Sequence, residues 1–299
     1  MSFDLYFAGV QNLIADHTLM DMGSCRLYSQ LRDRARGKLW LQHSKENPGT
    51  KVFVDSGAFT AWTKGKTIDV DDYINYINTN TKQLTLFASV DNIPGESKRK
   101  PTLKEKEESP KLSWDNYLYM RERVKEPDKL LPVFHIGEDF KYLKNMLESK
   151  FNGKHIPYIG LGGTVGIRKK GVKENWYKEC FDIIKESSNP NIKVHAFGMT
   201  KLDILESFPF TSADSTSWIM MAVYGFIYTK YGRICVSNVA TNRKNHINKL
   251  PKEIQTQIIN DIGEYGITME QCINDYKCRT IINIKYLQNW ADNYKYKGN

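Results

Sequence analysis

The sequence predicts one α/β domain of the (β/α)8, or TIM-barrel, class over residues 1–299, and two observations predict it. Short apolar segments alternate with helical segments eight times along the chain, without a second composition regime. Polar residues stand at the carboxyl ends of most of the apolar segments, and in a barrel those ends converge on one face, where active sites lie. Periodicity does not show closure, so a doubly wound open sheet is the alternative.

The predicted strands are short runs rich in apolar and β-branched residues. They cover residues 4–9, 51–57, 84–91, 130–136, 158–163, 193–199, 212–216 and 233–237. Apolar residues at helical spacing predict helices over 25–44, 69–79, 114–125, 140–149, 174–186, 201–206, 217–229 and within 252–294. Ser113 is expected to cap the helix at 114–125, and the C-terminal helices, about 251–299, are expected to pack on the barrel.

Residues 94–112 have a different composition from the rest of the chain. They are charged, contain Pro94, Pro101 and Pro110, and are almost free of large apolar side chains. Such a segment cannot bury much surface, so it predicts a mobile charged loop inserted into the barrel.

Charge and targeting signals bound the class of protein. Lys and Arg number 43 against 34 Asp and Glu, a net charge of +9, which suits a polyanionic partner such as nucleic acid. The alternative is a basic protein without such a partner. No apolar run reaches about eighteen residues and the N-terminus is unlike a signal peptide, so we expect a soluble cytoplasmic protein with no membrane partner. Five scattered cysteines agree with a reducing compartment.

Three carboxylates are the candidate catalytic residues. Asp55, Asp91 and Asp214 each stand at the end of a predicted strand, and carboxylates brought close together repel one another. One is therefore expected to have a raised pKa and to act as an acid or base, while another stays ionised as a nucleophile, as in sugar chemistry. The third can accept hydrogen bonds from a donor-rich ligand such as the edge of guanine. Taken alone, Asp214 is also a typical helix N-cap.

Aromatic residues and glycines lie next to these carboxylates. Phe59 and Phe197 are placed to sandwich a planar base, although core packing is the alternative for both. Glycines at 160, 162 and 163 leave backbone amides open to a ligand, or else only make a tight turn. The spacing of these glycines is not that of a phosphate-binding loop.

Five motifs together resemble the tRNA-guanine transglycosylase family. They are Asp-Ser-Gly-Ala-Phe at 55–59, Ser-Val-Asp at 89–91, Tyr-Ile-Gly-Leu-Gly-Gly at 158–163, His-Ala-Phe-Gly at 195–198 and Ser-Ala-Asp at 212–214. The residues of these motifs are most similar to those of the phage and bacterial branch of the family, whose members insert 7-deazaguanines into DNA. The resemblance covers about residues 4–240.

The resemblance implies a double displacement. Asp214 would attack C1′ of a deoxyguanosine and release guanine, and Asp55 would serve as general acid and base. Substrate binding would fall to the remaining residues at these motifs, Asp91, Phe59, Phe197, Gly162, Gly163, Ser56 and His195, and to His135 at the end of the fourth predicted strand. The incoming base would be a free 7-deazaguanine such as preQ0, and the location would be the host cytoplasm if the protein is phage-encoded.

The chain departs from the family in two places. The tRNA-acting members have Gln-Gly where this chain has His135-Ile136-Gly137, so the selection of the base there stays open. Those members also carry a Cys-x-Cys-x-x-Cys plus His zinc site, which this chain lacks. Cys235, His246, Cys272 and Cys278 could form a rearranged site, with buried free cysteines as the alternative and no metal as the expectation.

Basic segments are expected to contact a nucleic-acid backbone. They are Lys98-Arg99-Lys100, Arg168-Lys169-Lys170 with Lys173, and Arg243-Lys244. The alternative functions are a tRNA-acting enzyme with the same chemistry and a catalytically inactive barrel that only binds nucleic acid. A partner protein or a homodimer is also open.

Overall fold

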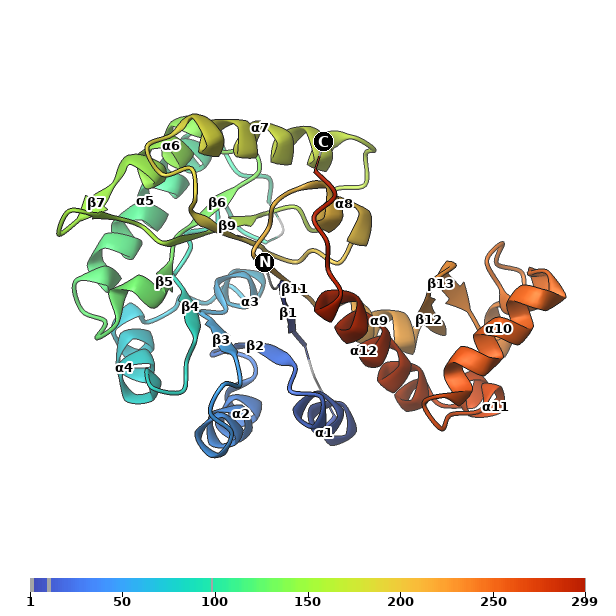
Figure 1. Cartoon of the computed structure of the whole chain (residues 1–299). Coiled ribbons are helices and arrows are strands. Elements are labelled where there is room, and N and C mark those ends of the chain that lie inside the picture. Colours follow the sequence, from blue (N-terminus) through green and yellow to red (C-terminus); the bar gives the residue numbers. More distant parts are fainter. Residues whose placement is uncertain (1–2, 10–11, 98, 299) are drawn as a thin grey trace.

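A parallel β-sheet occupies the centre of the protein, and helices surround it (Figure 1). The computed structural model describes residues 3–9, 12–97 and 99–298. The sheet has nine strands in the order β5-β4-β3-β2-β1-β11-β10-β9-β6, and its neighbouring strands run parallel. These strands are β1 (Asp4–Phe7), β2 (Cys25–Ser29), β3 (Val52–Asp55), β4 (Leu86–Ala88), β5 (Leu130–Leu131), β6 (Val133–His135), β9 (Tyr158–Gly162), β10 (Lys193–Ala196) and β11 (Ser212–Ser215).

The two ends of this sheet come from neighbouring residues. β5 pairs with β4, β6 pairs with β9, and only Pro132 separates β5 from β6. Proline has no N–H to donate, which interrupts the ladder at that residue. Its carbonyl still accepts a hydrogen bond of 2.9 Å from the Gly160 N–H. The sheet is therefore a nearly closed, parallel, barrel-like structure.

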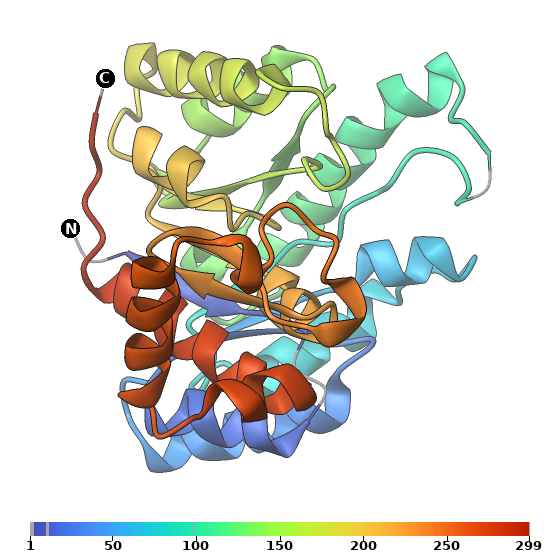
Figure 2. The ribbon, with the colours of Figure 1, turned by 90° about the vertical axis from the view of Figure 1, so that its right-hand side faces the viewer.

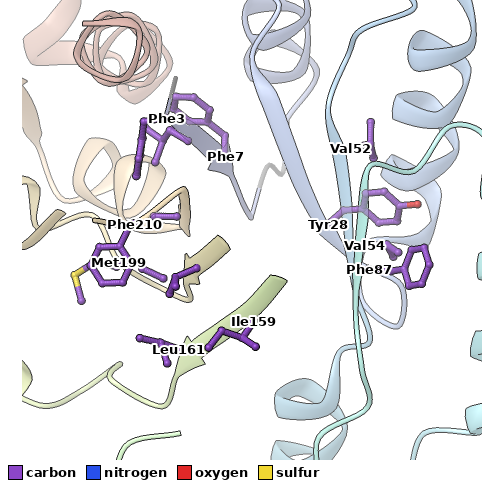
Figure 3. Close-up of a cluster of buried hydrophobic side chains, with 14 of the residues drawn as sticks. Phe3, Phe7, Tyr28, Val52, Val54, Phe87, Ile159, Leu161, Met199 and Phe210 are labelled. Atoms are coloured by element: carbon purple, nitrogen blue, oxygen red, sulfur yellow. The ribbon is translucent and has the colours of Figure 1, made fainter. Parts of the chain in front are cut away.

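Side chains alternate between two hydrophobic clusters along the strands. One cluster contains Tyr6, Leu27, Phe53, Leu86, Leu131 and Tyr158. The next residues along the same strands belong to the larger cluster, which helices cover, and Figure 3 shows part of it, including Phe7, Tyr28, Val54 and Ile159. This alternation sends apolar side chains to both faces of each strand and explains why the strands read as continuous apolar runs.

The helices follow the strands along the chain. They are α1 (Leu13–Asp21), α2 (Arg34–Glu46), α3 (Ala58–Thr63), α4 (Val70–Asn80), α5 (Leu103–Arg121), α6 (Phe140–Glu148), α7 (Val172–Glu186), α8 (Leu202–Ser207), α9 (Ser217–Val223), α10 (Lys252–Gly263), α11 (Met269–Asn274) and α12 (Tyr276–Asp292). Two short hairpins complete the fold, β7 (Lys150–Phe151) with β8 (Lys154–His155) and β12 (Phe226–Thr229) with β13 (Gly232–Cys235). Within the described ranges, no helix is long and apolar enough to cross a bilayer.

The C-terminal elements form a third hydrophobic cluster beside the sheet. Ile227, Ile234, Ile258, Ile262 and Ile282 are buried together there. Helix α12 contacts α9 and β12, and Figures 1 and 2 show it between the barrel-like sheet and the pair α10–α11. The predicted packing of helices 251–299 thus involves the β12–β13 hairpin as well.

The prediction of one helix over residues 25–44 is wrong. Residues 25–29 form strand β2, which pairs in parallel with β1 and β3, and only α2 is helical. Arg26 makes strand β2 hard to predict from the sequence, because a charged residue is unusual within a buried strand. The Arg26 side chain is fully buried, and its guanidinium donates to the carbonyls of Phe7 and Leu27.

The predicted eighth strand of the barrel, residues 233–237, is misplaced. It corresponds to β13, which pairs antiparallel with β12 in a separate two-stranded sheet. The sequence shows an apolar run there but not its partner, and the missing parallel strand is β2.

The loop predicted over residues 94–112 is mostly helix. Helix α5 begins at Leu103 behind a capping box of Thr102 and Glu105, and Pro110 lies inside it. Ser113 is therefore not a cap but an interior residue, whose Oγ accepts the N–H of Asn92 at 2.8 Å. Pro110 and the many charged residues favour a loop over a helix in the sequence. In the structure the capping box begins helix α5, which packs against the chain after β4.

Candidate active site

The three predicted carboxylates lie at the same end of the parallel sheet. Asp55 is the last residue of β3, Asp91 follows β4, and Asp214 lies near the end of β11. Burial raises the pKa of Asp55 to about 7, and the negative charges of Asp91 and Asp214 add to this effect. The three carboxylates are far apart in the sequence, but in the fold they are close enough for the charges of Asp91 and Asp214 to raise the pKa of Asp55.

Asp214 is held through one carboxylate oxygen. Its Oδ1 accepts hydrogen bonds from Nε2 of His195 at 3.2 Å and from the N–H of Gly198 at 3.0 Å. The alternative reading of Asp214 as a helix N-cap is wrong, because Thr216 precedes α9 at that position and Asp214 belongs to the strand. Both side-chain hydrogen bonds described for Asp214 fall on Oδ1, which leaves Oδ2 for a ligand.

The carboxyl group of Asp55 is suited to proton transfer because its pKa is about 7. Its Oδ2 accepts the N–H of Gly57 at 3.0 Å, a bond that lowers the pKa but is outweighed by burial and by Asp91. The neighbouring Ser56 is buried, and its Oγ accepts the N–H of Ala58 at 3.3 Å. Ser56 thus shapes the start of α3 behind Asp55.

Asp91 belongs to a chain of charged groups. Its Oδ2 lies 3.3 Å from Nε2 of His135, and Nδ1 of His135 lies 3.1 Å from Oε1 of Glu138. Burial alone would lower the pKa of His135, but Asp91 and then Glu138 raise it to about 10, so His135 is an imidazolium at neutral pH. Oδ1 of Asp91 is buried without a hydrogen-bond partner among the described residues, and a buried acceptor of this kind calls for a donor.

His195 lies behind Asp214 and not on the open end of the sheet. Its side chain is 0% exposed, and its ring meets the rings of Phe197, Phe53 and Tyr6 edge-on, with centroid distances of 4.5, 5.0 and 5.9 Å. The predicted role of His195 in touching a substrate does not agree with this burial. Its contact with Asp214 is what links it to the site.

The two predicted stacking residues differ in exposure. Phe59, on α3, is 66% exposed and lies 5.9 Å from the Trp62 ring, whereas Phe197 is half-buried against Phe53 and His195. No contact between the Phe59 and Phe197 rings occurs in the described part of the chain. Phe197 packs directly over Gly160, where a Cβ atom would meet its ring at 2.4 Å.

The glycines at the end of β9 border His135. A Cβ on the buried Gly162 would lie 3.1 Å from Cδ2 of His135, and one on Gly163 would lie 3.3 Å from Cβ of the same residue. Gly163 is exposed and has φ of +76°, which side chains rarely adopt. These two glycines therefore keep the backbone close to His135.

A cavity of about 950 Å³ opens beside Asp91. Trp62, Lys64 and Lys66 line one side of it, and residues 90–97 line the other, with Nε1 of Trp62 donating to the Gly95 carbonyl at 2.8 Å. Figure 2 shows α3 and the segment before α5 projecting next to each other from this end of the sheet. The cavity is larger than a single base needs and reaches from Asp91 toward exposed lysines.

The residues considered for zinc do not fit a zinc site. Across the ranges that the structure describes, no three His, Cys, Asp or Glu side chains are grouped to hold a metal. Instead the buried Arg279 donates to the carbonyls of Ala222, Cys272 and Ile273, and the thiols of Cys272, Cys235 and Cys278 lie near enough to affect its pKa. A guanidinium at this place repels a metal cation and itself joins the ends of α9 and α11.

The basic segments differ in how far they are paired. Arg99 is bound to Glu105, while Lys98 lies outside the described residues. Arg168, Lys169 and Lys170, after β9, are exposed. Arg243 lies 4.6 Å from the centre of the Phe226 ring and lines a cavity of about 450 Å³ together with Arg233 and Tyr224.

Three polar residues of the site were not expected from the sequence. Glu138 binds His135, while Ser212 and Tyr158 extend the contacts of His195 away from Asp214. The position of Ser212, two residues before Asp214 on the same strand, is the one signal that places it on the same face. Nothing in the sequence around Tyr158 indicates its partner.

A scan against protein-family models finds no match to this chain, and neither does a search of curated proteins, so its function is inferred from the geometry of the site.

Proposed function

We propose that this protein is a DNA-guanine transglycosylase, which exchanges guanine in DNA for a 7-deazaguanine base such as preQ0. The observation that carries the proposal is the group of three carboxylates with three different environments. Asp214 is held by two donors on one oxygen, Asp55 has a pKa of about 7, and Asp91 has an oxygen without a partner among the described residues. A surface that only binds a polyanion has no use for such a group.

Asp214 is the proposed nucleophile. Its Oδ2 attacks C1′ of the nucleotide while the C1′–N9 bond breaks and its electron pair leaves with guanine. The product is an aspartyl ester in which Oδ1 becomes the carbonyl oxygen. The donors on Oδ1, His195 and Gly198, fix the carboxylate orientation before the attack.

Asp55 is the proposed acid and base. With a pKa of about 7, part of the Asp55 population is protonated at neutral pH and can give its proton to the departing guanine. In the second step the carboxylate takes the N9 proton of the 7-deazaguanine, N9 attacks C1′, and Asp214 leaves as a carboxylate. One group thus serves both half-reactions.

Asp91 and the aromatic residues are proposed to hold the base. Asp91 lines the cavity of about 950 Å³, and its carboxylate suits the N1–H and exocyclic amine of guanine, which are both donors. Phe197 offers a fixed ring face, and Phe59 an exposed ring that can close on the base. Gly162 and Gly163 would bring backbone groups to its edge.

A nucleic acid is the proposed partner because the chain carries a net charge of +9 and its exposed cations include Arg168, Lys169 and Arg243. DNA is proposed over tRNA because the five motifs resemble most the branch of the family that modifies DNA. The base must leave the duplex, or come from a single strand, for C1′ to reach Asp214.

We also infer that the fold is the (β/α)8 barrel, with β5 and β6 as one strand interrupted at Pro132. The nine strands then count as eight. The hydrogen bonds of the Leu131 and Pro132 carbonyls with Ser89 and Gly160, both 2.9 Å, support closure on the two sides. A crystal structure with an open gap between β4 and β9 would contradict this inference.

The test is a base-exchange assay. Purified protein is incubated with radiolabelled guanine and either guanine-containing DNA or tRNA, and then with unlabelled preQ0. Label entering DNA alone supports the proposal, and label entering tRNA alone assigns the chain to RNA. Asp214→Asn should abolish exchange and leave DNA affinity unchanged or raised, whereas Asp203→Asn, an exposed carboxylate in α8, should exchange normally. Exchange by Asp214→Asn would show that Asp214 is not the nucleophile.

A further inference from the structure

His195 is the centre of a buried chain of hydrogen bonds that ends at Asp214. On one side, its Nε2 lies 3.2 Å from Oδ1 of Asp214. On the other side, its Nδ1 lies 2.5 Å from Oγ of Ser212, which in turn lies 2.7 Å from the hydroxyl of Tyr158. Ser212 and Asp214 come from β11, His195 from β10 and Tyr158 from β9, so three neighbouring strands build the chain.

Burial makes the direction of these hydrogen bonds matter. His195 and Ser212 are 0% exposed, and Tyr158 is 8% exposed, so an unpaired polar group in this chain has no access to bulk water. The rings of Tyr6, Phe53 and Phe197 surround the imidazole. The polar partners of His195 are therefore limited to Ser212 and Asp214 in the described part of the chain.

When Asp214 is ionised, as the proposed attack requires, one arrangement of the protons satisfies every group. An ionised Asp214 can only accept, so Nε2 of His195 must carry a hydrogen. Nδ1 of the neutral ring then accepts from the Ser212 hydroxyl, and the Ser212 oxygen accepts from the Tyr158 hydroxyl. Burial raises the pKa of Tyr158, which keeps that hydroxyl protonated at the end of the chain. If His195 were instead an imidazolium, Ser212 would accept from Nδ1 and donate to the Tyr158 oxygen, which would leave the Tyr158 hydrogen without an acceptor among the described residues.

We propose that Ser212 and Tyr158 are positioning residues, which hold His195 in the Nε2–H tautomer and thereby hold Asp214 for attack through Oδ2. The role in attack rests on the proposed function, while the tautomer does not. The ionised Asp214 keeps the ring hydrogen on Nε2, and the Ser212 hydroxyl supplies the donor that Nδ1 then needs. Together with the Gly198 N–H, this hydrogen fixes Oδ1 and presents the other oxygen to C1′.

Substitutions at Ser212 and Tyr158 separate the roles of these two residues in the chain of hydrogen bonds. Ser212→Ala removes the donor to Nδ1, so the buried Nδ1 loses its partner, the imidazole ring is held from the Asp214 side alone, and the Tyr158 hydroxyl also loses its partner. Tyr158→Phe leaves the Ser212 hydroxyl free to donate to Nδ1 and should have the smaller effect. Ser212→Thr keeps a hydroxyl and should restore the wild-type behaviour. We expect Ser212→Ala to lower kcat by about tenfold or more with little change in KM for the base, since an imidazole that has lost its second hydrogen bond orients its carboxylate less well.

The experiment measures tautomer and rate on the same protein samples. Long-range ¹H–¹⁵N spectra of histidine-labelled protein report the tautomer of His195, with the signal assigned from its loss in His195→Phe. We expect the Nε2–H tautomer in every one of these proteins, with the Nδ1 resonance of Ser212→Ala displaced from that of the wild type and of Tyr158→Phe because its Nδ1 accepts no hydrogen bond. Single-turnover release of guanine from DNA is then measured for each variant.

Two outcomes overturn the inference, and neither depends on the other. The first is an Nδ1–H ring or an imidazolium at His195 in the wild type at pH 7. The second is a Ser212→Ala protein that keeps both the wild-type Nδ1 resonance and the full rate. If the wild type itself releases no guanine, the proposed function fails, and the tautomer spectra still decide whether Ser212 fixes His195.

Discussion

Nε2 of His135 lies 3.3 Å from Oδ2 of Asp91, and this contact gives Asp91 its only described side-chain partner. The imidazolium is held from the other side by Glu138 at 3.1 Å. Because His135 compensates a carboxylate that is only 19% exposed, the pair is both a structural element and the floor of the proposed base site.

Replacing His135 should separate the effect of its charge from that of its hydrogen bond. In His135→Leu, Asp91 loses its partner, and we expect a loss of about 1–3 kcal/mol in the free energy of unfolding and at least a tenfold higher KM for the incoming base. His135→Gln keeps an N–H donor and should lose less of both. Urea unfolding and exchange kinetics measure the two quantities. Equal behaviour of the Leu and Gln variants would show that His135 does not support Asp91.

The raised pKa of Asp55 predicts a specific pH dependence. Its folded-state pKa of about 7 exceeds its ordinary value of 3.8, so protonated Asp55 stabilises the fold below pH 3.8, and this contribution is lost as the pH rises through 7. Asp55→Asn should therefore lose less stability than the wild type between pH 4 and pH 8, a window set by those two pKa values. Glu179→Gln, an exposed carboxylate, should follow the wild type. Parallel stability curves for the wild type and Asp55→Asn would contradict the raised pKa.

The sequence predicts the barrel-like sheet where a strand is uniformly apolar, as at Val52-Phe53-Val54, and misses it where tertiary contacts compensate a charge. Arg26 is such a case, because the carbonyls that its guanidinium binds come from β1 and from β2 itself. The capping box of α5, Thr102 with Glu105, is visible in the sequence, but Pro110 and the high charge of the segment favour a loop over a helix. Local patterns thus predicted most elements, and they failed where a distant residue decides.

The positions of Asp55, Asp91 and Asp214 could be predicted because carboxyl ends of parallel strands meet. Their partners could not. The bond between His195 and Ser212 depends on the register of β10 against β11, in which these two residues are direct neighbours, and register is a property of the assembled sheet. His195 was therefore expected to face the substrate, although the fold places it behind Asp214.

Gly160 is predicted to be required for the position of the Phe197 ring. An alanine there would place its Cβ 2.4 Å from Cε2 of Phe197 and 3.1 Å from Cδ2 of Leu131, so the ring must move. We expect Gly160→Ala to cost about 1–3 kcal/mol in stability and to raise KM for the base. Phe197→Leu added to Gly160→Ala should recover part of the stability, which a double-mutant cycle in urea measures. Gly263→Ala, with open space around its Cβ, is the control and should be near neutral, and strict additivity of the two changes would refute the contact.

Arg233 and Arg243 are predicted to contact phosphates of the bound DNA. Both line the cavity of about 450 Å³ together with Met221 and Tyr224, at the last turn of α9, the helix that follows the strand of Asp214. The guanidinium of Arg243 lies over Phe226, and Arg233 contacts Met221 at 3.7 Å, so each charge rests on an apolar floor with its remaining donors available to an anion. Removing either arginine should lower the slope of log affinity against log salt by about 1, because each phosphate contact releases about one counterion.

Fluorescence anisotropy with single-stranded DNA over a salt series measures this slope. Lys154→Ala is the matched control, because Lys154 lies between α6 and β9, at the opposite end of the strands from Asp214. If the arginine variants keep the wild-type slope, or if Lys154→Ala lowers it equally, Arg233 and Arg243 do not contact phosphates of the bound DNA.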